Sequence, residues 1–228
     1  MQRSISERIL IMERNPYSTV SEAYRLLRTN LEFCSPDHPL KSVVITSSVA
    51  QEGRTTTAIN LAVAFAHKEL NVLLIDADLR NPVIHKLFNK HNRGGLTTVL
   101  AKQSSIADMV QDTSIANLSV LTAGPISPNP SEMLSAIRMT ELMEELKAVY
   151  DMIILDTPPV SHVTDAAVVA AKSDGVLLVA SAGKVKKQAI LKAKAALNHV
   201  QANLLGVVLN DVKPKRSKGR NTYEAVES

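Results

Sequence analysis

The most regular pattern in the chain is a series of short, nearly uninterrupted aliphatic runs that begins at residue 42. Runs of this length without polar alternation are typical of parallel strands that are buried on both faces. The segments between them, such as 57–70 and 165–172, suit crossover helices. The sequence therefore predicts an α/β fold, a doubly wound and mainly parallel sheet with helices on both faces. The predicted strands lie at 42–46, 72–75, 118–121, 152–155, 175–179 and 204–209.

The first part of the chain has a different character. Residues 1–40 are more polar and contain no strand pattern, and 21–32 within them read as a helix with Ser21 as its N-cap. Two prolines then interrupt the chain before the first aliphatic run. We therefore divide the chain into an N-terminal helical segment at 1–40, an α/β domain at 41–212 and a flexible basic tail at 213–228.

Charge and composition exclude several classes of protein. The formal net charge is +4, but the basic excess lies in 213–220, and without it the chain is about neutral. The domain is therefore not expected to bind nucleic acid, and the absence of tryptophan disfavours base stacking. A single cysteine, Cys34, excludes a disulfide scaffold and a multi-thiolate metal site. The longest uncharged stretch, 113–131, contains three prolines and cannot span a membrane, so a soluble chain is expected.

The loop after the first run is the first candidate site. Residues 48–56 join a predicted strand to a predicted helix, an arrangement that brings backbone amides together at a helix N-terminus and favours phosphate. Gly53 and Thr55 match the P-loop pattern G-x-x-x-x-G-K-[ST]. Ser48 and Arg54 stand where that pattern has its first glycine and its lysine. Taken alone, an ordinary polar turn explains this loop better than a phosphate site does.

Acidic side chains at two other strand ends change that balance. Asp76 and Asp78 follow the second run, point the same way and repel each other unless a cation lies nearby. Asp156 ends the fourth run, as a Mg²⁺ anchor does in P-loop proteins. Because ligands bind beyond the carboxyl ends of parallel strands, the three strand ends predict one magnesium-nucleotide site. Asn210 ends the last run and either contacts adenine or starts a turn, and the sequence does not separate the two.

These motifs resemble the bacterial tyrosine kinases of exopolysaccharide and capsule assembly. The resemblance runs from about residue 21 to residue 212 and includes a pattern, E-x-x-R-x-x-R, that P-loop proteins in general do not share. The related partitioning and division-site ATPases carry an extra lysine early in the loop, and 47–50 contain none. The matching motifs are LIDADLRNP at 74–82, ILDTPP at 154–159, the loop at 48–56, and Glu22, Arg25 and Arg28.

The resemblance implies a P-loop NTPase fold of the deviant Walker type, with ATP and Mg²⁺ as cofactors. It implies that Asp78 accepts the proton of a tyrosine hydroxyl, whose ordinary pKa of about 10 makes it a poor nucleophile at neutral pH. Arg54 and Asp76 are the other implied catalytic residues. The implied nucleotide contacts are Ser48, Gln51, Glu52, Gly53, Arg54, Thr55, Thr56 and Asn210, and the implied metal ligands are Thr55, Asp76 and Asp156.

The resemblance also implies partners. Glu22, Arg25 and Arg28 share a helical face and are expected to contact a neighbouring subunit in a homo-oligomeric ring, although a salt-bridged surface explains them too. The chain is expected to be cytoplasmic and to be recruited to the inner face of the cell membrane by a membrane-bound modulator. It is expected to phosphorylate protein tyrosines, including its own Tyr223, and so to regulate synthesis of an exopolysaccharide, capsule or biofilm polymer.

The sequence departs from the family pattern in two places. Arg54 replaces lysine, and a wide planar guanidinium cannot tuck between phosphates as an ammonium does, while Ala50 and Gln51 replace Pro-Gly. Tyr223 stands alone where the family has a cluster of tyrosines, so an unmodified terminus is the alternative. Two other functions therefore stay open: a catalytically weak nucleotide-binding scaffold (pseudokinase) and a partitioning-type ATPase.

Overall fold

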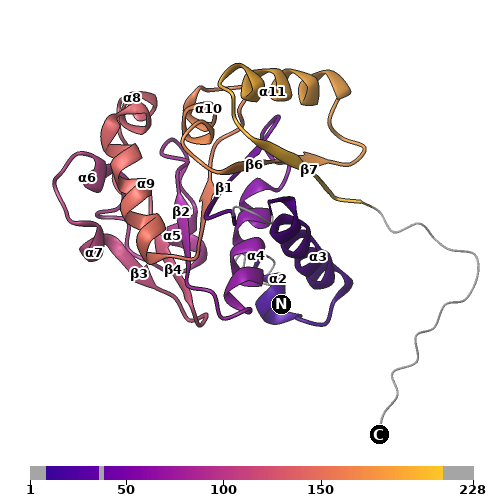
Figure 1. The fold of residues 1–228 in the computed structure, drawn as a ribbon, viewed down its shortest axis with the longest axis horizontal. Coiled ribbons are helices and arrows are strands. Elements are labelled where there is room, and N and C mark those ends of the chain that lie inside the picture. Colours follow the sequence, from indigo (N-terminus) through magenta and orange to yellow (C-terminus); the bar gives the residue numbers. More distant parts are fainter. Residues whose placement is uncertain (1–8, 36–38, 213–228) are drawn as a thin grey trace, which may run out of the picture.

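A seven-stranded sheet lies between two layers of helices in the computed structural model, which describes residues 9–35 and 39–212 (Figure 1). The strand order is β3-β4-β2-β5-β1-β6-β7, and every pair is parallel except the antiparallel pair β3 and β4. The predicted doubly wound, mainly parallel sheet is therefore confirmed. The strands are β1 (Ser42–Ser47), β2 (Val72–Asp76), β3 (Val110–Asp112), β4 (Leu118–Leu121), β5 (Met152–Asp156), β6 (Gly175–Ser181) and β7 (Leu204–Asn210).

The helices cover both faces of the sheet. The cluster of buried residues on one face includes side chains of α2 to α5, and the cluster on the other face includes side chains of α6 and α8 to α11. The described helices are α2 (Ile11–Arg14), α3 (Thr19–Cys34), α4 (Arg54–Ala66), α5 (Ile84–Leu87), α6 (Leu96–Leu100), α7 (Ile106–Met109), α8 (Pro130–Ser135), α9 (Ile137–Val149), α10 (Asp165–Ala170) and α11 (Lys187–His199). Among them, none has the length and apolar character that crossing a bilayer requires.

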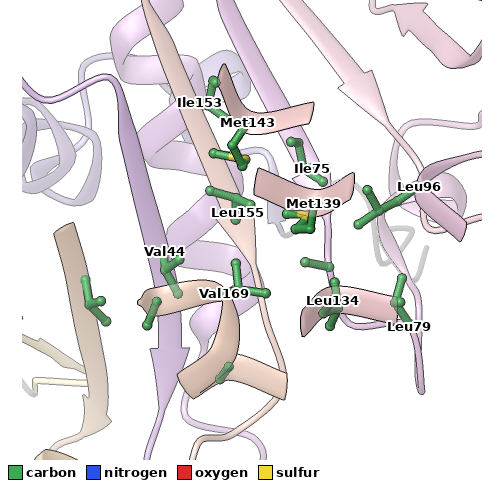
Figure 2. Packing of buried hydrophobic residues seen from close by; sticks show 14 of the residues in the cluster. Val44, Ile75, Leu79, Leu96, Leu134, Met139, Met143, Ile153, Leu155 and Val169 are labelled. Carbon is green, nitrogen blue, oxygen red and sulfur yellow. The ribbon is translucent and has the colours of Figure 1, made fainter. Parts of the chain in front are cut away.

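The side chains of successive residues in a central strand pack into the cores on opposite faces of the sheet. In β1, Val44 points into the core formed with α8 to α11, while Val43 points into the core formed with α2 to α4. Figure 2 shows the first of these cores, where Val44 and Leu155 from the sheet meet Met139 of α9 and Val169 of α10. Burial on both faces is the reason that these strands appear in the sequence as aliphatic runs without alternation.

The described part of the N-terminal segment packs against α4. Met12 is fully buried, and its backbone amide donates to Oδ1 of Asn60 at 3.0 Å. The Asn60 amide nitrogen in turn donates to the carbonyl of Ile9 at 2.6 Å. Tyr24 and Leu31 of α3 are buried in the same core. These helices therefore share their hydrophobic core with the sheet of the α/β domain.

The helix α3 begins earlier than the sequence predicts. Its N-cap is Ser18, whose extended backbone lets its hydroxyl accept a hydrogen bond from the Ser21 amide at 3.1 Å. The prediction of Ser21 as the N-cap was therefore wrong. The Ser21 hydroxyl instead donates to the carbonyl of Asn15 at 2.6 Å and so fixes the chain that enters the helix.

The strand order brings the candidate site together. β2, β5 and β1 are neighbours in the middle of the sheet, so their carboxyl ends lie side by side. Asp76 and Asp156 are direct partners in the ladder between β2 and β5. The loop that carries Gly53 follows the end of β1 on the same edge. Because these strands are parallel, residues that are distant in the sequence meet at this edge of the sheet.

Candidate functional site

The turn between β1 and α4 has the backbone shape of a phosphate-binding loop. Its last residue, Gly53, has φ 89° and ψ 19° and is the N-cap of α4. A Cβ at Gly53 would lie 2.0 Å from Nδ2 of Asn210, so any other residue would displace the Asn210 side chain and be strained by the positive φ. Gln51 also has a positive φ of 65°, at the position where the family pattern has glycine. The loop therefore keeps a glycine-like conformation at Gln51, at a cost of about 1 kcal/mol.

The amino end of α4 offers unpaired donors to an anion. The backbone amide of Thr57 is bonded to the carbonyl of Gly53 at 2.9 Å, which begins the hydrogen-bond ladder of the helix. The amides of 54–56 precede that ladder and have no partner within the helix. Together with the dipole of this 13-residue helix, they favour a bound phosphate group.

Arg54 joins the loop to two buried carboxylates. Its Nη2 lies 2.5 Å from Oδ2 of Asp78, and its Nε lies 3.9 Å from Oδ1 of Asp156. The Thr55 hydroxyl donates to Oδ2 of Asp156 at 2.7 Å. The side chains of Asp78 and Asp156 are 2% and 1% exposed. A cation and a hydroxyl from the loop therefore face acids from two neighbouring strand ends.

Asp76 adds a third buried acid whose charge is only partly compensated. Its Oδ2 accepts hydrogen bonds from the backbone amides of Val83 and Ile84, both at 3.0 Å. Its Oδ1 is buried and accepts no hydrogen bond from the described residues, and the same is true of Oδ1 of Asp156. Burial, with repulsion from Asp156 next, raises the pKa of Asp76 well above its ordinary range. Burial also raises the pKa of Asp156 to about 7, although Arg54 and Thr55 oppose that rise.

The unsatisfied oxygens fit a divalent cation. Two buried carboxylate oxygens and a threonine hydroxyl are hard donors of the kind that Mg²⁺ prefers. Within 9–35 and 39–212, no group of three or more His, Cys, Asp or Glu side chains is arranged to hold a metal ion. Mg²⁺ commonly takes one or two carboxylates and completes its shell with phosphate oxygens and water. Thr55, Asp76 and Asp156 therefore fit a magnesium ion that is shared with a nucleotide.

The structure brings most of the candidate residues together and leaves a few apart. Glu22, Arg25 and Arg28 lie on α3, and no described contact joins their side chains to the loop or to the acids at the strand ends. Tyr223 lies outside the described residues. The residues that meet on the loop or at the adjoining strand ends are Ser48, Gln51, Glu52, Gly53, Arg54, Thr55, Thr56, Asp76, Asp78, Asp156 and Asn210.

An ion pair that the sequence does not predict holds the turn after β2. Nε and Nη2 of Arg80 lie 2.8 and 3.0 Å from the two carboxylate oxygens of Asp165. The Asp165 side chain is fully buried at the start of α10, and the Ser131 hydroxyl of α8 also donates to it. Asp78 lies in the same turn and accepts the amide of Asn81 at 3.0 Å. The one feature of the sequence that could have indicated a role for Arg80 is its position two residues after Asp78.

The buried acids predict an unusual pH dependence for the protein without nucleotide and divalent cations. Because the pKa of Asp156 rises from 3.8 to about 7 on folding, the folded protein binds more protons between these values. These acids should therefore make stability fall as pH rises through this window, since the raised pKa of Asp76 acts in the same direction. The lowered pKa of partly buried His85 opposes them below its ordinary value of 6.5. Asp165 and Asp174 have lowered pKa values and titrate below this window.

Thermal unfolding between about pH 5 and pH 8 measures this effect. The unfolding midpoint should decrease with pH, and Asp156→Asn should flatten the decrease. Asp108→Asn, an exposed substitution on α7, should leave the slope unchanged. A midpoint that rises across this range in the unaltered protein would contradict the prediction.

A phosphate loop, paired carboxylates at strand ends and a mainly parallel sheet together define the P-loop NTPase class. Within it, residues 41–211 match the family described as AAA domain. The chain is 49% identical to tyrosine-protein kinase YwqD of Bacillus subtilis over 207 aligned residues. This alignment covers 91% of this chain and 87% of that protein.

Solved structures agree with this relationship. The kinase domain of Escherichia coli tyrosine kinase ETK superposes with a TM-score of 0.88 at 34% identity, covering 99% of this chain and 88% of that one. The chimerical protein CapA2B2 superposes with a TM-score of 0.85 at 39% identity, covering 92% and 91%. The chain belongs to the bacterial tyrosine kinase family, and the resemblance seen in its motifs is confirmed.

Proposed function

We propose that this protein is an ATP- and Mg²⁺-dependent protein-tyrosine kinase that phosphorylates Tyr223 and tyrosines of other proteins. Similarity to proteins named tyrosine-protein kinases supports the proposal. The observation that carries it is the meeting of Arg54, Thr55, Asp78 and Asp156 at the amino end of α4. This cluster supplies a cation for phosphates, ligands for a metal and a carboxylate for proton transfer.

Each side chain has a distinct task in the proposed reaction. The amides of 52–56 and the Arg54 guanidinium bind the phosphates, while Thr55, Asp76 and Asp156 hold Mg²⁺. When bound, Mg²⁺ neutralises charge on the phosphate oxygens. Asp78 accepts the proton of the tyrosine hydroxyl as that oxygen attacks the terminal phosphate of ATP. The products are a phosphotyrosine, ADP and a protonated carboxyl group.

The contact between Arg54 and Asp78 competes with the proposed reaction. One oxygen of Asp78 is bonded to Arg54, and the other accepts the Asn81 amide. A phosphate offers the guanidinium a competing anion with a geometry that suits two parallel hydrogen bonds. Transfer of Arg54 from Asp78 to a phosphate leaves the carboxylate available to the tyrosine hydroxyl. Binding of ATP is thereby coupled to the release of the base.

Mass spectrometry of the chain after incubation with ATP and Mg²⁺ tests this function. We expect phosphate on Tyr223 because it is the tyrosine of the C-terminal tail. Tyr17 is the matched control, since its side chain is 94% exposed and unselective transfer would label it as well. Tyr223→Phe should remove the phosphate, and Tyr17→Phe should leave it unchanged.

The Arg54→Lys variant separates this function from a second candidate. The bond between Arg54 and Asp78 favours a nucleotide-binding scaffold with weak turnover, because it occupies the proposed base. ATP binding without phosphotyrosine in the unaltered chain, together with labelling of Arg54→Lys, would select the scaffold. Absence of label in both proteins, with the cytoplasmic part of the modulator present, would contradict the kinase proposal.

The helix α3 carries the proposed contact with a neighbouring subunit. Glu22 is exposed and pairs with Arg25 at 3.0 Å, while Arg25 also donates to the carbonyl of Pro16 at 2.7 Å. Arg28 donates to the carbonyl of Ala64 at 2.8 Å, which fixes its guanidinium against α4. This set of charges, held in place on one helix, suits a homo-oligomeric ring.

Substitution at Glu22 should weaken that assembly. Glu22→Ala removes an exposed carboxylate, so the fold should persist while the particle mass measured by light scattering shifts toward the monomer. Glu132→Ala, an exposed change on α8, is the control and should leave the mass unchanged. Equal masses for both variants and the unaltered protein would argue against a role of this motif in assembly.

The kinase acts in the cytoplasm beside the membrane in this proposal. A membrane-bound modulator recruits it to the inner face and activates it, and phosphorylation then regulates synthesis of an exopolysaccharide or capsule polymer. The membership of the chain in the bacterial tyrosine kinase family supports this role. Copurification of the chain with membranes only when the modulator is present would test the recruitment step.

A further inference from the structure

Glu52 is a buried acid in the middle of the phosphate loop. Its residue surface is 2% exposed, and both of its carboxylate oxygens are engaged within the protein. Oε2 accepts the Ser48 hydroxyl at 2.7 Å and the Val49 amide at 2.8 Å. Oε1 accepts the amide of Ser181 at the end of β6 at 3.3 Å. A carboxylate repels phosphate, so these contacts do not describe a nucleotide ligand.

The backbone of the same residue is fixed by the next strand. The Asn210 side chain, at the end of β7, donates through Nδ2 to the carbonyl of Glu52 at 3.0 Å. The same nitrogen lies against Gly53, where it fills the space that a Cβ would occupy. β1, β6 and β7 are successive strands on one side of the sheet (Figure 1). The loop after β1 is therefore tied to the ends of both following strands.

We infer that Glu52 and Asn210 are positioning residues that hold the phosphate loop in its binding conformation by connecting it to the ends of β6 and β7. This inference rests on the proposed function, because it concerns the same nucleotide site. The Glu52 carboxylate closes the loop onto Ser48 and Val49 and connects it to β6. Asn210 directs its amide nitrogen to the loop backbone, so we assign it to the loop and not to the adenine base.

The variant Glu52→Gln tests the first residue. A glutamine has one acceptor oxygen, so its NH₂ group must face either the Ser48 and Val49 donors or the Ser181 amide. We expect the KM for ATP and the calorimetric Kd of ATP with Mg²⁺ to rise about tenfold, since hydrogen bonds to a charged group are lost. The kcat should change by less than about twofold, because the reacting groups are untouched.

A purely structural role predicts a different result. Partial unfolding of Glu52→Gln would lower kcat through loss of active protein and leave KM unchanged, and that outcome would overturn the inference. Glu144→Gln, an exposed change on α9, is the matched control and should alter neither constant. The Kd needs no phosphate transfer, so a chain that binds ATP without kinase activity contradicts the proposed function and still tests this inference. A chain that binds no ATP overturns both.

Asn210→Ala provides the second variant, and it also serves if Glu52→Gln does not fold. If Asn210 positions the loop, Kd should rise by the same factor for ATP and GTP, because both carry the same phosphates. If Asn210 instead contacts the base, the ratio of the two Kd values should change. A changed ratio, or an unchanged Kd for both nucleotides in a folded variant, would overturn the assignment of Asn210.

Discussion

Asp78→Asn should lower the rate of tyrosine phosphorylation by about 10²- to 10⁴-fold, the usual contribution of a positioned general base. Asparagine has nearly the shape of aspartate but cannot accept the phenolic proton. ATP binding should persist, because a neutral asparagine attracts Arg54 less than the carboxylate does and leaves the guanidinium available to a phosphate. Autophosphorylation with labelled ATP measures the rate, and calorimetry measures the binding.

The control for this prediction is Asp108→Asn, which changes an exposed carboxyl group on α7. It should leave both the rate and the affinity unchanged. If Asp78→Asn transfers phosphate as fast as the unaltered protein, Asp78 is not the base. If it loses ATP binding together with activity, the carboxylate acts in nucleotide binding.

Arg54→Ala should reduce the free energy of unfolding by about 3–5 kcal/mol at pH 8, as expected when one partner of a buried ion pair is removed. The Arg54 side chain is 15% exposed and contacts Asp78 and Asp156, whose side chains are almost fully buried. Alanine leaves these carboxylates next to Asp76 without a facing cation. Denaturant unfolding without nucleotide and divalent cations measures the change.

Two comparisons test the origin of this loss of stability: the Arg54→Lys variant, and the Arg54→Ala variant at a lower pH. Arg54→Lys retains a positive charge and should keep most of the stability. The loss in Arg54→Ala should be smaller at pH 6, because Asp156, with a pKa of about 7, is largely protonated there. Equal stability of Arg54→Ala and the unaltered protein at pH 8 would show that the guanidinium does not balance these acids.

The sequence predicts elements that are set by local patterns. Six strands appear as aliphatic runs because residues such as Val43 and Val44 are buried on opposite faces. β3 was missed because it is three residues long, partly exposed and antiparallel at the edge of the sheet. The sequence pattern predicts Ser21 as the N-cap because any serine before an apolar helix fits it, and only the structure distinguishes Ser21 from Ser18.

The sequence predicts the site residues that lie at the ends of parallel strands. It does not predict the contacts that join a loop residue to a distant part of the chain. The ladder between β2 and β5 makes Asp76 and Asp156 neighbours, as the rule for parallel strands requires. Arg80 finds Asp165 from 85 positions away in the sequence. Glu52 likewise contacts Ser181 from 129 positions away. In the sequence both residues look like charged loop residues, because their partners lie on distant elements of the chain.

The contact between Asn210 and the phosphate loop also limits how far Tyr223, the proposed acceptor, can lie from the site. The last strand, β7, ends at Asn210, which contacts the loop, and Tyr223 follows Asn210 by thirteen residues. Thirteen residues, even fully extended, place Tyr223 at most about 45 Å from Asn210. Because Tyr223 is covalently connected to Asn210, its concentration near the site of its own chain does not fall when the protein is diluted. In the proposed ring, the site of a neighbouring subunit within this distance would compete for the same tyrosine.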